Sequence, residues 1–406
     1  MNPIVGTIFS ARMLVALLMG FSSGLPLLLT GSVLQAWMTD EGVDLGTIGL
    51  FALVGLPYTL KFVWAPLTDR FRVPLLGRRR GWLLAVQLLL MVAIAALGWT
   101  QPAENPLVVA MAAWLVTFFS ASQDIVIDAY RREALADNEL GLGAALYVNG
   151  YRIGMLLASG GGLILADLMP FSAVYQLMAT CMLIGIVTTL FAPEPKIAAG
   201  APQNLREAVI EPFVDYFRRR HAVLILLFIL LYKLGDTMAS HMTTPFYLDL
   251  GFSKTEIGAV VKLFGFWATV IGGMLGGVFI LRSGIYRALW GFGILQALST
   301  AGFALLALTG YSLPLLAGVI AFENLSAGMG TAAFVAFMAA LTNRRFTATQ
   351  YALLSSLMGI PRVIVAAPTG YVADWLGWSV FFLGCVLIAV PGLLLLTRFR
   401  DWLAEG

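Results

Sequence analysis

Twelve apolar runs, each long enough to cross a lipid bilayer, constrain the fold of this 406-residue chain more than any other feature. A spanning helix needs about 20 residues, and only helices or closed barrels satisfy their backbone hydrogen bonds within the hydrocarbon. The runs lie at 13–38, 46–67, 81–99, 107–130, 141–166, 172–192, 221–247, 255–281, 287–310, 313–341, 349–373 and 378–397. Only 12% of the residues are charged, against about 25% in soluble domains. We therefore predict an all-α membrane protein with twelve transmembrane helices.

The Arg and Lys residues outside these runs are distributed unequally between the two sides of the membrane. The connections that follow even-numbered runs carry almost all of them, namely Arg70, Arg72, Arg78, Arg79, Arg80, Arg131, Arg132, Lys196, Arg206, Arg218, Arg219, Arg220, Arg282, Arg287, Arg344 and Arg345. The opposite connections carry Lys254 alone. Because cytoplasmic loops are enriched in Arg and Lys, both termini are predicted to be cytoplasmic. The first run is too long for the apolar core of a signal peptide, so we expect no cleaved leader.

A polar linker at 193–220 separates the first six runs from the last six. We therefore predict an N-terminal six-helix bundle at 1–192, a cytoplasmic linker at 193–220 and a C-terminal six-helix bundle at 221–406. Within the linker, one apolar side chain recurs at every fourth position: Leu205, Val209, Phe213 and Phe217. This spacing predicts an amphipathic helix at the membrane surface, which Pro212 would kink or break. A solvated connector is the alternative.

The two halves of the chain repeat short sequence patterns in the same order. FFSAS at 118–122 is matched by NLSAG at 324–328, and GYRIG at 150–154 is matched by GIPRV at 359–363. Parallel repeats of six spans each resemble the arrangement of major facilitator transporters. The halves differ in charge, because Gly330 and Phe334 stand in the second half where the fourth run has two aspartates.

The fourth run carries Ser120, Asp124 and Asp128 at intervals of four residues. On an α-helix these residues fall within roughly 80° of arc, so they share one face. A carboxylate at bilayer depth costs about 2.5–3.5 kcal/mol and rarely faces lipid. We interpret this face as the wall of a solute pathway, with Asp124 and Asp128 as a coupled, proton-responsive pair. The alternative is that a neighbouring cation keeps both ionised and ties helices together.

The connection between the second and third runs, APLTDRFRVPLLGRRRGW at 65–82, resembles the loop signature of the major facilitator superfamily. The matching residues are Asp69, Arg70, Gly77, Arg78 and Arg79. Ala65 stands where the family usually has its first glycine. We predict that Asp69, Arg70, Arg78 and Arg79 form a charge latch, or cytoplasmic gate. An anchor that acts only through its positive charge is the alternative.

Longer segments resemble the AmpG-type muropeptide permeases. They are GFSSGLPLLLTGSVLQAWM (20–38), IGLFALVGLPYTLKFVWAPLTDR (48–70), SASQDIVIDAY (120–130), GYRIGML (150–156), FENLSAGMGTAAFVAFM (322–338) and TATQYALLSSL (347–357). The resemblance implies a multi-pass inner-membrane permease that imports N-acetylglucosaminyl-1,6-anhydro-N-acetylmuramyl peptides with protons. It thereby implies roles in peptidoglycan recycling and β-lactamase induction, without the hydrophobic C-terminal extension of some members. The alternative is another anionic cargo, such as an acyl-CoA.

The cargo that this resemblance implies presents sugar hydroxyls, amides and carboxylates. Arg and Lys suit carboxylates, and aromatic rings suit the apolar faces of sugars. The candidate cargo-binding residues are Gln35, Tyr58, Lys61, Tyr147, Asn149, Tyr151, Arg152, Glu323, Asn324 and Arg362. Arg152 and Arg362 have the alternative role of tying helices together, and Lys61 that of pairing or snorkelling. Lys233 and Asp236, three residues apart, are interpreted as a structural ion pair.

Enzyme activity is not expected from this sequence. Its two histidines, His221 and His241, form no HExxH pattern, and no GxSxG pattern occurs. Cys181 and Cys385 lack the spacing of metal ligands, so we expect no metal and no cofactor. The glycine-rich run at 271–277 predicts close helix packing instead of a phosphate loop. The expected partners are the glycopeptide, protons and the bilayer, with no nucleic acid and a monomeric state.

Overall fold

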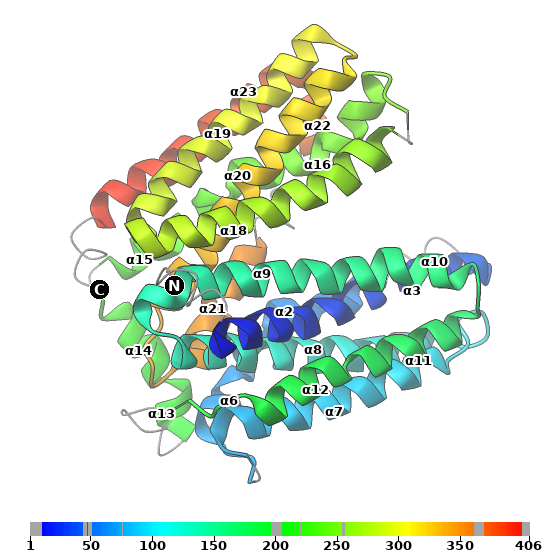
Figure 1. The fold of residues 1–406 in the computed structure, drawn as a ribbon, viewed down its shortest axis with the longest axis vertical. Helices are drawn as coiled ribbons and strands as arrows, with labels where there is room; N and C mark the ends of the chain where they lie inside the picture. The colour runs from blue at the N-terminus through cyan, green and yellow to red at the C-terminus, as the bar shows by residue number, and fades with distance from the viewer. Residues whose placement is uncertain are drawn as a thin grey trace. The chain divides into compact units, whose positions relative to one another are not determined.

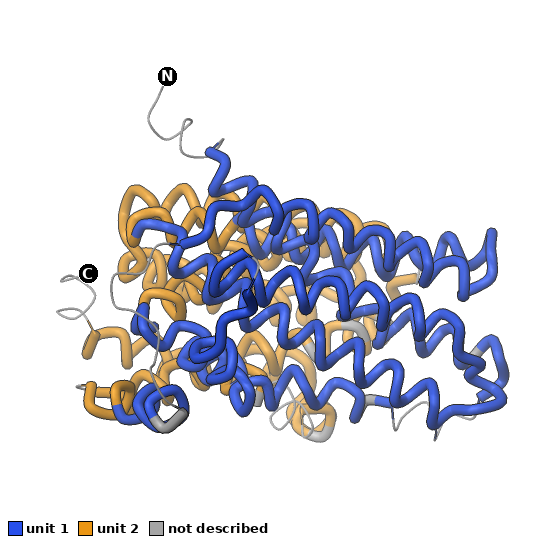
Figure 2. The backbone as a smooth tube through the Cα atoms, turned by 90° about the horizontal axis from the view of Figure 1, so that it is seen from below, with its two compact units in different colours: residues 1–136, 146–214, 341–356 blue, residues 137–145, 215–340, 357–406 orange. Residues whose placement is uncertain are grey.

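The computed structural model describes residues 10–43, 47, 51–74, 76–195, 205–219, 221–253, 256–360 and 369–399. Helices dominate these residues, and no β-strand occurs among them (Figure 1). The chain forms two compact units, which Figure 2 shows in different colours. Unit 1 comprises residues 1–136, 146–214 and 341–356, and unit 2 comprises residues 137–145, 215–340 and 357–406. The predicted boundaries at 192 and 220 stay a prediction.

Unit 1 contains the first helices of the chain. They are α2 (Ala11–Leu29), α3 (Ser32–Asp40), η1 (Phe51–Gly55), α5 (Leu56–Leu60), η2 (Lys61–Val63), α6 (Ala65–Arg70), α7 (Arg78–Gly98), α8 (Pro106–Ala134), most of α9 (Leu140–Leu156), the π-helical η4 (Leu157–Gly161), α10 (Gly162–Ala166), α11 (Phe171–Cys181), α12 (Leu183–Phe191) and α13 (Leu205–Val209). Within this unit α7 packs against α8, α11 and α12, while α2 packs against α8 and α12. The unit also holds most of α21 (Thr347–Ile360), whose sequence lies far from the rest.

Unit 2 contains most of the remaining helices. They are η3 (Asp137–Glu139), α15 (Ala222–Tyr232), α16 (Leu234–Asp249), the π-helical η5 (Ile257–Phe264), α18 (Gly265–Ser283), α19 (Ile285–Thr309), α20 (Leu313–Ala340), α22 (Thr369–Leu376), α23 (Trp378–Leu395) and η7 (Leu396–Phe399). Here α20 packs against α18 and α19, and α23 packs against α15, α16 and α19 (Figure 1). Helix α14 (Glu211–Phe217) runs from one unit into the other.

Nine helices within the described ranges are long and apolar enough to cross a membrane. They are Ala11–Met38, Arg78–Gly98, Pro106–Ala134, Phe171–Phe191, Ala222–Tyr247, Ala259–Ser283, Ile285–Thr309, Leu313–Ala340 and Trp378–Phe399. The second predicted span is broken into short helices, where Pro57 and Pro66 begin new helices because proline lacks an N–H group. The fifth passes through the π-helical η4, and part of the eleventh lies outside the described residues. The count of twelve therefore stays a prediction.

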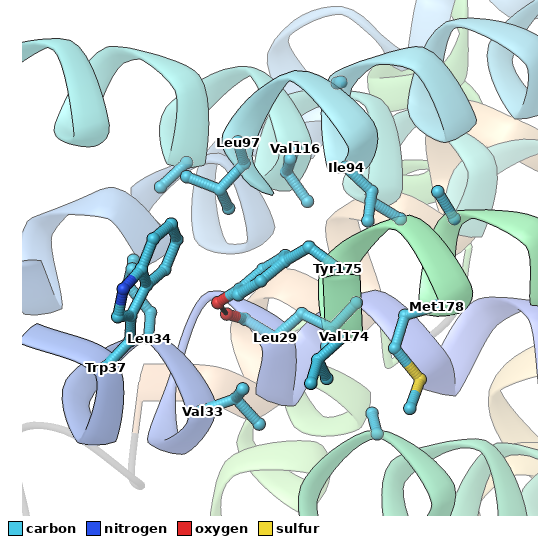
Figure 3. Packing of buried hydrophobic residues seen from close by; sticks show 14 of the residues in the cluster. Leu29, Val33, Leu34, Trp37, Ile94, Leu97, Val116, Val174, Tyr175 and Met178 are labelled. Atoms are coloured by element: carbon cyan, nitrogen blue, oxygen red, sulfur yellow. Dashed lines mark hydrogen bonds between the residues drawn. The ribbon is translucent and has the colours of Figure 1, made fainter. Parts of the chain in front are cut away.

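The apolar core of unit 1 is built around Tyr175 on α11. Figure 3 shows its ring among Leu29, Leu97 and Val116, which come from three other helices. The Tyr175 hydroxyl donates a hydrogen bond of 2.6 Å to the Leu29 carbonyl, so the one polar atom of the ring is satisfied. Trp37 packs on the same ring at a centroid distance of 5.3 Å. This contact holds α3 and α11 together.

Helices α2 and α9 meet backbone to backbone through glycines. A side chain at Gly20 or Gly24 of α2 would overlap the backbone carbonyls of Tyr147 and Tyr151 on α9. Small residues four apart permit such close approach between membrane helices, where lipid offers no hydrophobic driving force. In unit 2, Gly272 of the glycine-rich run likewise meets the backbone of α20. The predicted close packing of that run is confirmed.

The predicted linker helix forms as two short helices, α13 and α14, with a turn at Ile210 between them. Pro212 occupies the first turn of α14, so the break expected at this proline is present. Helix α13 packs against α6. The Gln350 side-chain amide donates a hydrogen bond of 3.0 Å to the Pro212 carbonyl, which attaches α14 to α21. The position of the linker at a membrane surface stays a prediction.

We expect Gly24→Ala to destabilise the protein, because the new methyl group would displace the α9 backbone. Overpacking typically costs about 1–3 kcal/mol in the free energy of unfolding. The thermal midpoint of purified protein in detergent measures this effect. Gly384→Ala is the matched control, since a side chain there meets nothing within 4 Å. If Gly24→Ala has the same thermal midpoint as the control, then α2 and α9 can move apart without a loss in the free energy of unfolding.

Candidate functional site

Helix α8 carries the polar face predicted for the fourth run. Ser120, Asp124 and Asp128 are all buried within unit 1. The helix extends over 29 residues, Pro106–Ala134, and begins with a proline in its first turn, a position that tolerates a missing N–H group. The two carboxylates are therefore held one turn apart on a continuous helix, as the four-residue spacing predicts.

Asp128 lies between two cations. Its Oδ2 atom is 4.0 Å from Lys61 Nζ, and its Oδ1 atom accepts a hydrogen bond of 3.2 Å from Arg131 Nη2. Lys61 also attracts the Asp124 carboxylate electrostatically. All four residues are at least 93% buried, so water screens these charges little. The two carboxylates and two cations balance each other.

Asp124 is connected to α2 and α9 through a hydroxyl chain. Ser23 donates a short hydrogen bond to Asp124, and the Ser23 hydroxyl lies 3.1 Å from the Tyr147 hydroxyl. The glycine contacts between α2 and α9 place Ser23 and Tyr147 this close, because Gly24 follows Ser23 directly and packs on the α9 backbone. Tyr147 was predicted to contact cargo, whereas Ser23 was not singled out.

Arg131 is the residue that links the most partners in this cluster. Its Nη2 atom also donates to the Tyr351 hydroxyl at 3.0 Å, and its guanidinium lies 4.5 Å from the Tyr147 ring centroid, a cation–π distance. Arg131 is only 3% exposed, yet its Nε and Nη1 atoms have no hydrogen-bond partner among the described residues. The cluster thus retains unused donors for an anion.

Two further hydrogen bonds attach the broken second span to α8. Tyr58 donates to Ser120 at 2.9 Å, and Trp64 donates to Ser122 at 3.0 Å. Lys61 lies between these two residues in sequence, so both bonds hold η2 against the carboxylates. Tyr58 was a predicted site residue, but Trp64 was missed. The signal that could have found Trp64 is its spacing of three residues from Lys61.

Among the remaining predicted site residues, Tyr151 borders the cluster, with its ring centroid 6.2 Å from that of Tyr147. Gln35 is exposed on α3, Asn149 is buried on α9, and Tyr151 and Arg152 are half-buried on α9. Arg362 lies outside the described residues. Their roles in cargo binding stay predictions.

Unit 2 holds a second polar cluster, formed by residues of α16, α18, α19 and α20 and by Lys233, which lies between α15 and α16. Lys233 pairs with Asp236 at 3.4 Å, which confirms the predicted ion pair, and donates to Gln296 at 2.9 Å. Glu323 accepts a hydrogen bond of 2.5 Å from Ser299. Asn324, the neighbouring residue on α20, accepts from Thr269 at 2.7 Å. The predicted residues Glu323 and Asn324 therefore lie in unit 2 and bind their own neighbours there.

The loop residues of the predicted latch form a buried ion network in unit 1. Arg79 is completely buried and binds Asp69 at 2.7 Å and Glu133 at 2.5 Å, while Arg78 binds Glu133 at 2.8 Å. Glu133 lies at the end of α8 and was not predicted. Arg70, which was predicted, is half-buried and has its guanidinium 5.6 Å from the Phe71 ring centroid.

Asp69 also caps helix α21. Its carboxylate accepts hydrogen bonds from the backbone N–H of Ala348 at 3.3 Å and of Thr349 at 2.9 Å, and from the Thr349 hydroxyl at 2.8 Å. A carboxylate at a helix N-terminus satisfies free N–H groups and is attracted by the helix dipole. Glu194 caps α7 in the same way, accepting from the backbone of Arg79 and Arg80. These contacts form a set of helix caps joined by arginines, and the role of the predicted latch as a gate stays a prediction.

The sequence profile of the Major Facilitator Superfamily matches residues 12–366. The anhydromuropeptide permease of Escherichia coli (strain K12) is 48% identical over 394 residues, which cover 97% of this chain and 80% of that protein. The chain belongs to the major facilitator superfamily, in the AmpG family of transporters. A putative transporter named AmpG 4 from Rickettsia conorii is 35% identical over 405 residues, or 95% of each chain. These relatives are permeases and transporters, not enzymes.

Solved structures agree with the fold of the superfamily. The fucose:proton symporter FucP of E. coli superposes with a TM-score of 0.74 at 14% identity, covering 97% of this chain and 99% of that one. The proton:xylose symporter XylE superposes with a TM-score of 0.72 at 10% identity, covering 96% and 95%. At such identities the likeness concerns the fold alone.

We expect Asp69→Ala to destabilise unit 1 strongly, because it leaves Arg79 and the N-terminus of α21 without their shared acceptor. Removing one partner of a buried ion pair typically costs about 3–5 kcal/mol. The thermal midpoint in detergent should fall accordingly. Arg70→Gln is the control within the same motif and should change stability by about 0.5 kcal/mol or less. If the two substitutions lower the thermal midpoint equally, the loop acts only as an anchor through its positive charge and not as a charge latch.

Proposed function

We propose that this chain imports anhydromuropeptides from the periplasm to the cytoplasm across the bacterial inner membrane, driven by protons. The 48% identical relative is named for this cargo. The observation that carries the proposal is the buried cluster of Asp124, Asp128, Lys61 and Arg131, which contains guanidinium donors that have no partner among the described residues. Muropeptide carboxylates are the anions that such donors bind well.

The geometry suggests how cargo and protons are coupled. Lys61 is held loosely by Asp128 at 4.0 Å, so a cargo carboxylate can compete for it and for the free donors of Arg131. Asp128 and Asp124 would then lose part of their neutralisation. Two carboxylates one turn apart in a desolvated site cannot both stay ionised cheaply, so the pair would take up a proton. Cargo binding thereby favours proton binding.

The proton gradient supplies enough energy for this import. One proton moving down a gradient equivalent to 100 mV releases about 2.3 kcal/mol, which corresponds to roughly fifty-fold accumulation. On the cytoplasmic side the pair would lose its proton, and Asp128 would again pair with Lys61. The cargo would then be released. The cytoplasmic position of both termini, the monomeric state and the roles in cell-wall recycling and β-lactamase induction belong to the same proposal.

Proteoliposomes with an imposed proton gradient should accumulate a defined anhydromuropeptide by up to about fifty-fold per 100 mV. A protonophore should abolish accumulation and leave equal cargo concentrations on both sides of the membrane, because protons then no longer have a gradient. An acyl-CoA, the alternative anionic cargo, should fail to compete. Competition by acyl-CoA together with no muropeptide uptake would replace the proposed cargo by the alternative. Uptake that a protonophore leaves unchanged would refute proton coupling.

Asp124→Asn and Asp128→Asn should each abolish accumulation against a gradient, and at least one should still exchange cargo without an imposed gradient. Each removes one carboxylate from the proton-responsive pair but keeps the size of the side chain. Lys61→Gln should weaken binding of anhydromuropeptide more than binding of the peptide-free disaccharide, since it removes a carboxylate partner. Glu104→Gln, at an exposed carboxylate, is the control. If both Asp variants fold and accumulate cargo normally, the pair is a fixed tie between helices.

A further inference from the structure

The polar cluster of unit 2 has a different charge balance from that of unit 1. Asp236 and Glu323 supply two carboxylates, and Lys233 is the one cationic partner that the described residues give either of them. In unit 1, Asp124 and Asp128 face two cations, Lys61 and Arg131. With every group ionised, the cluster of unit 1 is neutral, whereas that of unit 2 carries one uncompensated negative charge. A net charge within membrane helices is costly.

Lys233 and helix α19 connect the two carboxyl groups of unit 2. Lys233 lies 3.4 Å from Asp236 and donates to Gln296 at 2.9 Å, and Ser299, one turn along α19 from Gln296, donates to Glu323 at 2.5 Å. Two carboxylates in one cluster with a single cation cannot both stay ionised cheaply. One proton bound by the pair makes the cluster, including Lys233, neutral.

We propose that Asp236 and Glu323 bind one shared proton and form a second proton-binding site, in unit 2. This inference deepens the proposed proton-driven import and rests on it for its role in transport. Ser299 fixes the Glu323 carboxyl by a hydrogen bond of 2.5 Å. Lys233 is fixed in turn by Gln296 at 2.9 Å. The proton is therefore the one component of the cluster that can leave without moving a side chain.

A small cavity provides the route by which this proton exchanges. It is lined by Asp236, Gln296 and Thr300, with Tyr232 and Cys385 nearby, and has room for a water-sized group. Gln296 is 5% exposed, and its Nε2 atom has no hydrogen-bond partner in the described part of the chain. A water molecule there can accept from Gln296 and take the proton from the carboxyl pair.

The other titratable groups that face the pair add no charge. They are Tyr232 on α15, Tyr247 on α16 and Cys385 on α23. Tyr and Cys side chains are neutral near pH 7. When the proton passes to water as hydronium, two carboxylates remain opposite one lysine. The repulsion between them then acts directly between α16 and α20, which carry Asp236 and Glu323.

Infrared titration of the full-length protein in lipid nanodiscs tests proton binding without transport. The wild type should show the carbonyl band of a protonated carboxyl group at neutral pH. Asp236→Asn and Glu323→Gln should each remove it, because one remaining carboxylate is balanced by Lys233. Glu256→Gln, at a half-buried carboxylate of the same unit that accepts hydrogen bonds from Ser253 and Tyr311, should keep it. Absence of the band from the wild type, or its persistence in both variants, would overturn the proposal.

Transport assays on the same variants test the role of this proton. Asp236→Asn should still exchange cargo across proteoliposomes, and both variants should lose the roughly fifty-fold accumulation expected per 100 mV. Uptake by the wild type that does not depend on the proton gradient would refute the proposed proton-driven import. The infrared band would still show whether the carboxyl pair binds a proton. Coupled uptake by the wild type and by both folded variants would instead refute the role of this pair.

Discussion

Uncompensated charge inside a membrane is the constraint on which this structure depends. Each buried carboxylate described above has a specific partner that neutralises it or donates hydrogen bonds to it. Asp128 has Lys61 and Arg131, while Asp69 has Arg79 and the N-terminus of α21. Because Lys61, Arg79 and the N-terminus of α21 belong to other helices than the carboxylates they meet, the same contacts that remove the electrostatic penalty also fix how those helices pack.

Close backbone packing makes these polar contacts possible. Helices α2 and α9 approach each other through Gly20 and Gly24, and this approach brings Ser23 to Asp124 and to the Tyr147 hydroxyl. Larger residues would separate the helices and leave the hydroxyl chain open. The second span shows the opposite adaptation, because its prolines break it into short helices and so place Lys61 beside α8.

Sequence reasoning could predict what local spacing determines. The helical fold, the shared face of Asp124 and Asp128 and the Lys233–Asp236 pair all follow from residues within one turn or one span. Lys61, Tyr58 and Tyr147 were predicted as site residues, but the contacts they make could not be predicted, because these contacts join distant segments. Tyr351 lies 220 residues from Arg131, and Ser23 lies 101 residues from Asp124. Glu133 and Glu194 were missed for the same reason, since no spacing connects them to the arginine loop.

The two clusters differ in what can change their charge. In unit 1 the neutralising charges are the side chains of Lys61 and Arg131, which stay bound to the chain. Their interaction with Asp124 and Asp128 changes only when another anion competes for them, so this cluster is sensitive to acidic cargo. In unit 2, on our inference, part of the neutralisation comes from a proton, which exchanges with solvent. That cluster is sensitive to pH. A transporter that couples an anionic cargo to a proton gradient needs both sensitivities. On our proposals, the pair in unit 1 takes up its proton when cargo competes for Lys61 and Arg131, and the pair in unit 2 exchanges its proton with solvent directly.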